Sequence, residues 1–160
     1  MDRLAARDVP RAVTDAFRFA GSPIGSEPLP GGHIHRNVLV TCTGGRYVLQ
    51  RLNDRVFPDL DAVVSNVERV VAHLKAGGRE GLELVETVGG GLSHRAADGS
   101  VWRAFRFLEG TVRRAIPAGP TDAFEAARAF ADYLTALADL PDPPLTPTIV
   151  DFHDLHHRLP

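Results

Sequence analysis

The sequence predicts an α+β fold, in which an antiparallel sheet of about five strands packs against one long helix and is followed by a C-terminal helical extension. Two observations predict it. Runs of β-branched and aromatic residues come in pairs joined by short glycine-containing turns, and one strongly periodic helical segment separates two groups of such runs. Strands paired as hairpins are antiparallel, which disfavours parallel βαβ winding.

The composition limits the classes of partner. The chain has 160 residues, 44% hydrophobic and 24% charged, which is ordinary for a globular domain. Its 18 basic and 20 acidic side chains give a net charge of -2, so no basic excess would hold nucleic acid or an anionic membrane surface. Cys42 can form no internal disulfide, and the charged start of the chain has no secretory character. We therefore expect a cytoplasmic protein that binds neither nucleic acid nor membrane.

The first half of the chain predicts one helix and three extended segments. Apolar residues at helical spacing indicate a helix over 12–19, and a weak extended segment covers 24–29. The clearest hairpin joins the runs 34–43 and 46–52 through Gly44–Gly45.

The strongest helix of the sequence follows this hairpin. Asp59 is its expected N-cap and Gly77 its C′ glycine. Its buried stripe is expected to consist of Leu60, Val63, Val67, Val70 and Leu74.

Further strands are predicted over 82–88, 92–95 and 100–108, with Asp98–Gly99 as the turn of the last hairpin. A second long helix is expected to run from an N-cap at Thr121 to about Leu140. Its inward side chains would be Phe130, Leu134 and Leu137.

A glycine loop, Pro30-Gly31-Gly32-His33, precedes the first definite strand. Glycine lets backbone N–H groups approach an anion closely, as a phosphate-covering hairpin requires, although an ordinary turn would look the same. The loop is no Walker A motif, because no G-K-[ST] follows. It is no dinucleotide fingerprint either, because a strand comes next instead of a helix.

The histidines favour no metal site. His33 and His35 are two apart on an expected strand and would face the same way, but no third ligand accompanies them. His153, His156 and His157 lack the spacing of zinc proteases. Solvated or hydrogen-bonded histidines are the expected outcome, and no metal ligand is predicted.

Three positions have both a functional and an ordinary interpretation. Glu68 lies beside the buried stripe of the long helix and is suited to meet a cation, or simply forms a rim interaction. Gln50 and Arg51 alternate between the two faces of their strand, so one of them could reach a phosphate, or Arg51 is a surface residue. The Glu-Gly break that ends 105–110 is a plain strand exit or a hinge.

Taken together, these segments resemble the small lobe of the aminoglycoside phosphotransferase and choline kinase-like superfamily, which is related to the protein kinases. The nearest likeness is to sugar kinases of the N-acetylhexosamine 1-kinase type. The residues that carry the resemblance are Gly32-His33-Ile34, Val38-Leu39-Val40, the run from Arg46 to Asn53, Phe57-Pro58, Asn66-Val67-Glu68, Trp102-Arg103, Phe107-Leu108-Glu109, Phe152-His153-Asp154 and His157-Arg158.

The resemblance implies a kinase that uses ATP and Mg²⁺ to phosphorylate a hydroxyl group of a small molecule. Residues 1–110 would form the nucleotide-binding small lobe, and 111–160 the hinge and the first helix of a large lobe. The implied nucleotide-binding residues are Gly31, Gly32, His33, Val48, Gln50, Arg51, Glu68, Leu108 and Glu109. The glycine loop would cover the phosphates, Glu68 would orient a phosphate-binding cation, Val48 would roof the base, and the backbone at Leu108 and Glu109 would meet adenine.

The sequence departs from the family pattern in several places. Gln50 stands at a strand position that is Lys or Arg in many relatives, and the only lysine, Lys75, lies on the long helix. His35 replaces an asparagine of the loop, with Asn37 two positions later. The catalytic H-x-D-x-x-x-x-N segment and the metal-binding aspartate are absent, so no catalytic residue is predicted and the Mg²⁺ ligands would lie in the large lobe.

We therefore expect this chain to be inactive by itself. It is either the N-terminal part of a longer kinase, which the apolar second helix favours, or a complete small nucleotide-binding protein. An uncovered apolar helix would also make the chain a homo-oligomer. Three functions remain open: the ATP-binding lobe of a kinase for an N-acetylhexosamine, another sugar, a choline-like alcohol or homoserine; a non-catalytic nucleotide-binding or interaction module; and a structural domain without a ligand.

Overall fold

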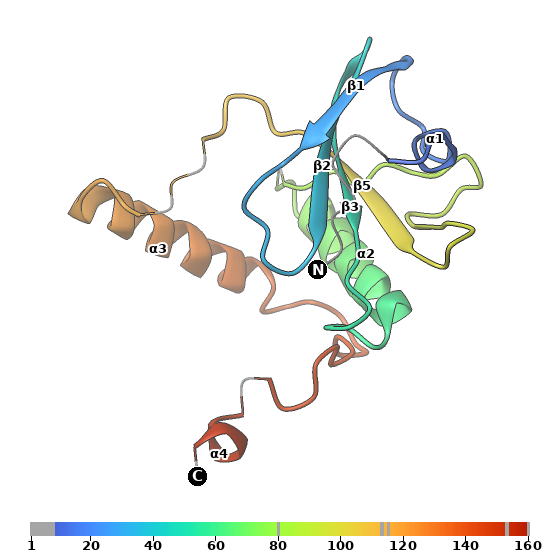
Figure 1. The fold of residues 1–160 in the computed structure, drawn as a ribbon. Helices are drawn as coiled ribbons and strands as arrows, with labels where there is room; N and C mark the ends of the chain where they lie inside the picture. Colours follow the sequence, from blue (N-terminus) through green and yellow to red (C-terminus); the bar gives the residue numbers. More distant parts are fainter. Residues whose placement is uncertain (1–8, 80, 113, 115, 153, 160) are drawn as a thin grey trace.

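The computed structural model describes residues 9–79, 81–112, 114, 116–152 and 154–159. Its centre is a five-stranded sheet in the order β1-β2-β3-β5-β4, in which every neighbouring pair is antiparallel. The strands are β1 (Pro23–Pro28), β2 (Arg36–Cys42), β3 (Gly45–Arg51), β4 (His94–Arg95) and β5 (Val101–Arg106). The predicted α+β class and the antiparallel sheet are both confirmed (Figure 1).

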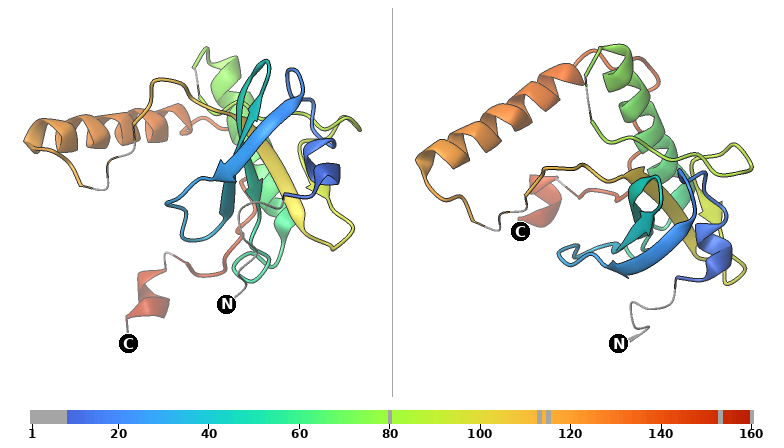
Figure 2. Two further views of the ribbon diagram at one scale, coloured as in Figure 1. Left: turned by 45° about the horizontal axis from the view of Figure 1, so that its top comes forward. Right: turned by 90° about the horizontal axis from the view of Figure 1, so that it is seen from above.

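Two short and two long helices complete the fold: α1 (Arg11–Thr14), α2 (Leu60–Ala76), α3 (Pro120–Ala136) and α4 (Leu155–Arg158). Helix α2 lies along one side of the sheet, α1 lies near the opposite side, and α3 extends away from the sheet, as the three views show (Figures 1 and 2). No helix in the part of the chain described here is long and apolar enough to cross a membrane.

The β2–β3 hairpin forms as predicted, with the turn shifted by one residue. Cys42 pairs with Gly45, so the two turn residues are Thr43 and Gly44. Gly44 is required because its backbone lies against another segment: an added Cβ would come within 2.6 Å of the carbonyl oxygen of Ala20. This close approach brings the N-terminal segment against the end of the hairpin.

One face of the sheet carries the larger of the two apolar clusters. Val38, Leu49 and Ala104 are in direct register across β2, β3 and β5, and all three are fully buried. Val13 and Phe17 from the N-terminal segment pack on the same cluster. Val13 and Phe17 thus lie on the same side of the N-terminal segment, as their helical spacing predicts.

The helix predicted over 12–19 is nevertheless too long. Helix α1 ends at Thr14, and the backbone from Phe17 onward pairs with a distant segment instead. Phe17 forms an isolated bridge with Thr87, and Arg18 donates its backbone N–H to the carbonyl oxygen of Glu86 at 2.9 Å. Long-range backbone pairing thus replaces the last turn of the expected helix.

The strand predicted over 82–88 is also wrong. The segment makes one bridge to β5, between Leu84 and Phe105, and then turns to meet Phe17 at Thr87. Because its hydrogen bonds are divided between two partners, it forms no continuous ladder. The strands predicted over 92–95 and 100–108 are present but shorter, as β4 and β5, and Gly99 adopts the positive φ of 81° that the predicted turn requires.

Helix α2 begins as predicted, because the Asp59 side chain accepts a hydrogen bond from the backbone N–H of Ala62 at 2.8 Å. Its C-terminal glycine is one residue later than expected: Gly77 has φ -77°, and Gly78 takes the left-handed conformation with φ +70°. The first turns bury Leu60, Val63 and Val64 against Leu52 and Val101, whereas the later members of the predicted stripe, Val67, Val70 and Leu74, are half-buried.

Helix α3 differs from its prediction at both ends. Pro120 is its first residue and Gly119 its N-cap, so Thr121 is no cap, and the helix ends at Ala136, before Leu140. Phe130 and Leu134 are 62% and 53% exposed instead of facing inward, because α3 extends away from the sheet. Self-association through this apolar surface stays a prediction.

The end of α3 and the segment that follows it lie against α2. Polar contacts hold them there, and we call this set of contacts the α2 tether. Asn66 and Thr146 exchange two hydrogen bonds of 2.7 and 3.0 Å. The Arg69 guanidinium donates to the carbonyl oxygens of Pro141 and Pro144 at 2.7 and 3.2 Å. His73 contacts the carbonyl oxygen of Ala136 at 3.0 Å.

The last residues add little to the fold. His153 and the side chains of His157 and Arg158 lie outside the described residues. His156 is exposed, and its backbone N–H donates to the Asp154 carboxylate at 2.9 Å.

Candidate functional site

Three polar side chains cross the sheet side by side on the face that α2 covers. Asn37 of β2 pairs with Gln50 of β3, and Gln50 pairs with Arg103 of β5. We call these three residues the polar row. They share the face of Leu52 and Val101, which contact α2, because alternate residues of a strand point the same way.

An apolar surface adjoins the polar row on the same face. Leu39, Val48 and Phe105 are the next residues of β2, β3 and β5 on this side, and they are again in direct register. Leu39 and Phe105 are buried and Val48 is half-buried. We call these three residues the apolar shelf. These apolar side chains thus adjoin a line of polar groups, and Val48 is the one of the three that is partly exposed.

The polar row is joined by hydrogen bonds whose direction is fixed by its arginine. Arg103 Nε donates to Gln50 Oε1 at 2.9 Å, and Gln50 Nε2 donates to Asn37 Oδ1 at 2.7 Å. A guanidinium can only donate, so Gln50 must present its oxygen to Arg103 and its NH₂ group to Asn37. Asn37 then presents its own NH₂ group at the end of the row, and this group is a donor as well.

Arg103 is a buried cation without a counter-charge. The residue is 8% exposed, and among the described residues its Nη1 has no hydrogen-bond partner and none of its nitrogens forms an ion pair. Burial lowers the pKa of Arg103 to about 10. A buried positive charge with free donors is costly unless an anion accompanies it, so the site is suited to a negatively charged ligand.

The glycine loop lies between β1 and β2, against one end of the polar row. A Cβ added to Gly32 would come within 2.8 Å of Asn37 Nδ2 and 3.0 Å of the carbonyl oxygen of His35. Gly31 has φ 109°, which favours glycine. The backbone of the loop can therefore approach the donors of the row more closely than it could with bulkier residues at positions 31 and 32. A phosphate-covering loop requires such an arrangement.

His35 fixes the end of the loop through a hydrogen bond and a ring contact. Its Nδ1 accepts a hydrogen bond from the backbone N–H of Asn53 at 3.2 Å, and its ring stacks on Phe57 with centroids 5.3 Å apart. Burial, and in second place the charge of Arg103, lower the pKa of His35. Because β2 begins only at Arg36, His33 and His35 lie in the loop and not on the expected strand. His33 is exposed, and the described residues include no cluster of three or more His, Cys, Asp or Glu that could hold a metal.

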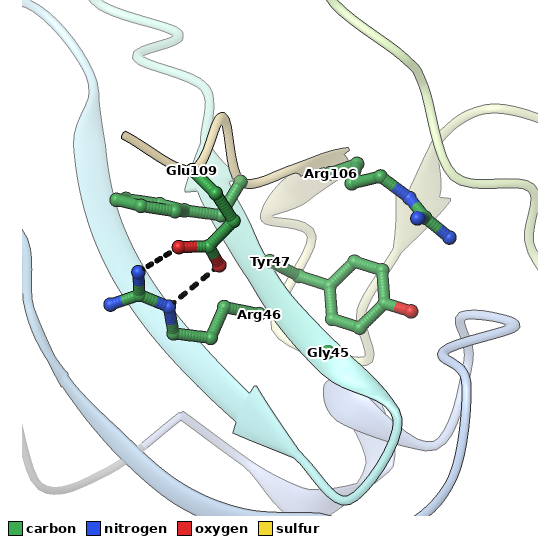
Figure 3. A pocket seen from close by; sticks show the side chains of 6 residues that line it. Gly45, Arg46, Tyr47, Arg106 and Glu109 are labelled. Atoms are coloured by element: carbon green, nitrogen blue, oxygen red, sulfur yellow. Dashed lines mark hydrogen bonds and ion pairs between the residues drawn. The ribbon is translucent and has the colours of Figure 1, made fainter. Parts of the chain in front are cut away.

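The predicted hinge lies at the exit of β5, where Glu109 forms an ion pair with Arg46 of β3. Arg46 Nε donates to Glu109 Oε1 at 2.9 Å and Arg46 Nη2 donates to the second oxygen (Figure 3). The hydrogen bonds from Arg46 lower the pKa of Glu109. The guanidinium also lies 4.3 Å from the centroid of the Phe107 ring. Leu108 is 45% exposed, and its carbonyl oxygen accepts a hydrogen bond from the Thr111 hydroxyl at 2.8 Å.

A small cavity of about 110 Å³ adjoins this ion pair, at the turn end of β3. Its lining consists of Gly45, Arg46, Tyr47, Arg106, Phe107 and Glu109 (Figure 3). The polar row lies toward the other end of β3. The cavity is therefore separate from the anion-suited part of the face, and it is too small for a nucleotide.

The structure brings together some of the residues predicted from the sequence. Gly32 and Gln50 meet at Asn37, with Val48 beside them on the same face. Arg51 is on the opposite face, where alternation from Gln50 placed it.

Glu68 lies one helical turn beyond Val64 and is half-buried, and it makes no hydrogen bond or ion pair with another described residue. Its proposed role with a cation stays a prediction, as do the adenine contacts of Leu108 and Glu109.

Sequence reasoning missed Asn37 and Arg103 as site residues. The signal for Arg103 was present: it is the one charged residue in the run Val-Trp-Arg-Ala-Phe, over which the strand is fully buried. A charge inside such a run needs a partner or a function. Asn37 could be recognised only from its pairing with Gln50 across β2 and β3, and the exact register of two strands is not evident from a sequence.

Comparison with known families gives a match over most of the chain. A sequence profile of the phosphotransferase enzyme family matches residues 26–158. The match starts within β1 and includes the glycine loop, the polar row, the apolar shelf, α2 and the exit of β5.

Proposed function

Because the chain belongs to the phosphotransferase enzyme family, we propose that it binds ATP on the sheet face that carries the polar row, as the kinase-like ATP-binding lobe of that family. The glycine loop would cover the phosphates and the apolar shelf would lie under the base. The observation that carries this proposal is the close approach of the Gly32 backbone to Asn37. An added Cβ at residue 32 would come within 2.8 Å of Asn37 Nδ2, so the loop lies directly against the polar row only because residue 32 is glycine.

The residues present suit the parts of a nucleotide. The polar row presents N–H donors and a cation, which match phosphate oxygens, and the apolar shelf presents Leu39, Val48 and Phe105, which match a purine face. Mg²⁺ would bring positive charge to the phosphates in this family, but we assign no ligand for it to this part of the chain.

The finer function is that of a small-molecule kinase that transfers the γ-phosphate of ATP to a hydroxyl group. An N-acetylhexosamine is the proposed acceptor, on the resemblance of the segments given above. The alternative is a non-catalytic nucleotide-binding or interaction module. Because the 160 residues contain no H-x-D-x-x-x-x-N segment, we propose that this stretch of chain by itself binds nucleotide without transferring phosphate.

A binding experiment with matched glycine variants tests the proposal. ATP is titrated into the 160-residue chain by calorimetry, and Gly32→Val is compared with Gly81→Val, at a glycine where an added Cβ meets nothing within 4 Å. We expect the wild type and Gly81→Val to bind ATP alike and Gly32→Val to bind at least about tenfold more weakly, because its side chain displaces Asn37. Absence of ATP binding by the wild type, or equal binding by all three proteins, would contradict the proposal.

A further inference from the structure

We propose that Arg103 is the cation that holds the phosphates of the bound nucleotide, in place of a basic residue on β3. The inference rests on the proposed function and goes beyond it, because it identifies which residue of this chain recognises the anionic part of the ligand. The resemblance places the phosphate-binding cation on β3, whereas here the cation is on the neighbouring strand β5. Gln50, on β3, positions that cation.

The polar row places the guanidinium of Arg103 beside Gln50. Gln50 is neutral and cannot attract phosphate by charge, but its carboxamide accepts from Arg103 Nε at 2.9 Å and so holds the guanidinium in the plane of the row. The two strands pair at these residues, which brings the Arg103 side chain next to the Gln50 position. The positive charge missing at position 50 is therefore supplied from position 103.

The guanidinium of Arg103 is buried and, among the described residues, has no counter-charge. No described carboxylate pairs with it, and no described acceptor meets its Nη1. Buried arginines in proteins are normally paired, because an isolated buried charge is strongly unfavourable. Phosphates in proteins are commonly bound by the paired N–H groups of an arginine, which donate to two phosphate oxygens. Arg103 can provide such a pair.

The surroundings of Arg103 add donors and no negative charge. Asn37 carries an NH₂ group at the loop end of the row, and the Gly32 backbone lies directly against it, since an added Cβ would come within 2.8 Å of Asn37 Nδ2. Burial, and in second place the charge of Arg103, lower the pKa of His35, which brings no negative charge. Donors, a cation and the glycine loop therefore occur together, and within the described part of the chain no acidic group forms an ion pair with Arg103.

The alternative candidate for this task is Arg51, the neighbour of Gln50. It points to the opposite face of the sheet, with Trp102 as its cross-strand partner. A phosphate beneath the glycine loop could not reach it without a change in strand register, which would expose the buried cluster around Leu49.

The test compares how strongly the phosphates contribute to binding. The affinities of ATP and adenosine are measured by calorimetry for the wild-type chain, Arg103→Met and the matched control Arg106→Met, an exposed arginine on the same strand that pairs with Glu83. We expect Arg103→Met to lose about 10- to 100-fold in ATP affinity, the worth of a charge-assisted fork of hydrogen bonds, with adenosine affinity changed by less than about twofold. Arg106→Met is expected to match the wild type for both ligands.

A second variant moves the charge back to β3. In the double variant Gln50→Lys with Arg103→Met, an ammonium at position 50 is expected to restore at least about a third of the lost ATP affinity. If Arg103→Met does not fold, Arg103→Lys decides. It keeps the charge but loses the fork of donors, so its ATP affinity is expected to fall at least about threefold with adenosine affinity unchanged, and an unchanged ATP affinity overturns the assignment.

The outcomes separate the two proposals. If the wild type binds ATP and Arg103→Met keeps the same ratio of ATP to adenosine affinity, the assignment of Arg103 is wrong and the nucleotide site stands. If the wild type binds neither ATP nor adenosine, the proposed function fails and the assignment fails with it.

Discussion

Replacing Arg103 with methionine should make the folded chain more stable, which is unusual for a substitution at a buried position. Methionine keeps an unbranched apolar side chain in the same space and removes the charge. Burial lowers the pKa of Arg103 to about 10 in the folded chain, well below the ordinary value of an arginine. At ~1.4 kcal/mol for each pH unit, burying the charged form costs the folded state about 3 kcal/mol at neutral pH.

The substitution also removes a favourable contact, which sets the net effect. Gln50 Oε1 loses the 2.9 Å hydrogen bond from Arg103 Nε, and an unpaired half-buried acceptor costs about 1–2 kcal/mol. The difference leaves Arg103→Met about 1–2 kcal/mol more stable than the wild type. Ordinary substitutions at buried sites lower the free energy of unfolding by about 0.5–3 kcal/mol, so even the sign is informative.

Urea unfolding followed by tryptophan fluorescence measures this difference. Trp102 is the single tryptophan, is 4% exposed and neighbours the substituted residue, so its emission reports on the sheet. Far-UV circular dichroism serves as the second probe. Arg106→Met is the control, because its exposed ion pair with Glu83 contributes about 1 kcal/mol or less. A free energy of unfolding for Arg103→Met that falls more than about 1 kcal/mol below the wild type would refute the reasoning.

Three further predictions concern stability. Leu49→Ala, in the centre of the buried cluster, should lower the free energy of unfolding by about 2–5 kcal/mol in the same urea experiment; a loss under about 1 kcal/mol would contradict the assignment of this cluster as the core. Asp59→Ala should cost about 1 kcal/mol through the lost N-cap of α2, whereas Asp59→Asn should cost little, and equal losses would argue against capping. His35 has a lowered pKa when folded, so its contribution to stability is full above its ordinary pKa of 6.5 and is lost as the pH falls through the folded value; thermal melting between pH 7 and pH 5 should therefore decline less in His35→Asn, and parallel declines would exclude His35 as the cause.

The parts of the fold that the sequence predicts well are those decided by neighbouring residues. The β2–β3 hairpin follows from two β-rich runs around a glycine turn, and the start of α2 follows from a capping aspartate before an apolar stripe. In both cases the partners in space are also near in sequence. Local preference and final structure therefore agree there.

The failures occur where distant backbone groups decide the structure. The last turn expected in the first helix is replaced because Phe17 and Arg18 find partners at Thr87 and Glu86. The same contact diverts the predicted strand over 82–88. Neither event has a signature in the residues involved, whose spacing fits a helix or a strand equally well.

The candidate site shows the same division. Alternation alone predicts that Gln50 and Arg51 face opposite ways, and that is what the structure shows. Which of the two faces the glycine loop, and which residue of β5 stands beside it, depends on register between strands that are far apart in sequence. Arg103 could be recognised as unusual from its apolar neighbours, but not as the partner of Gln50.

The α2 tether connects helix α2 to the C-terminal part of the chain. Asn66 and Arg69 of α2 hydrogen-bond the segment that follows α3, and His73, one turn further on, contacts the last residue of α3, Ala136. Glu68 sits between two of these anchors on the same helix. Displacing the C-terminal segment would therefore either break these hydrogen bonds or move α2, the helix that carries the Glu68 carboxylate.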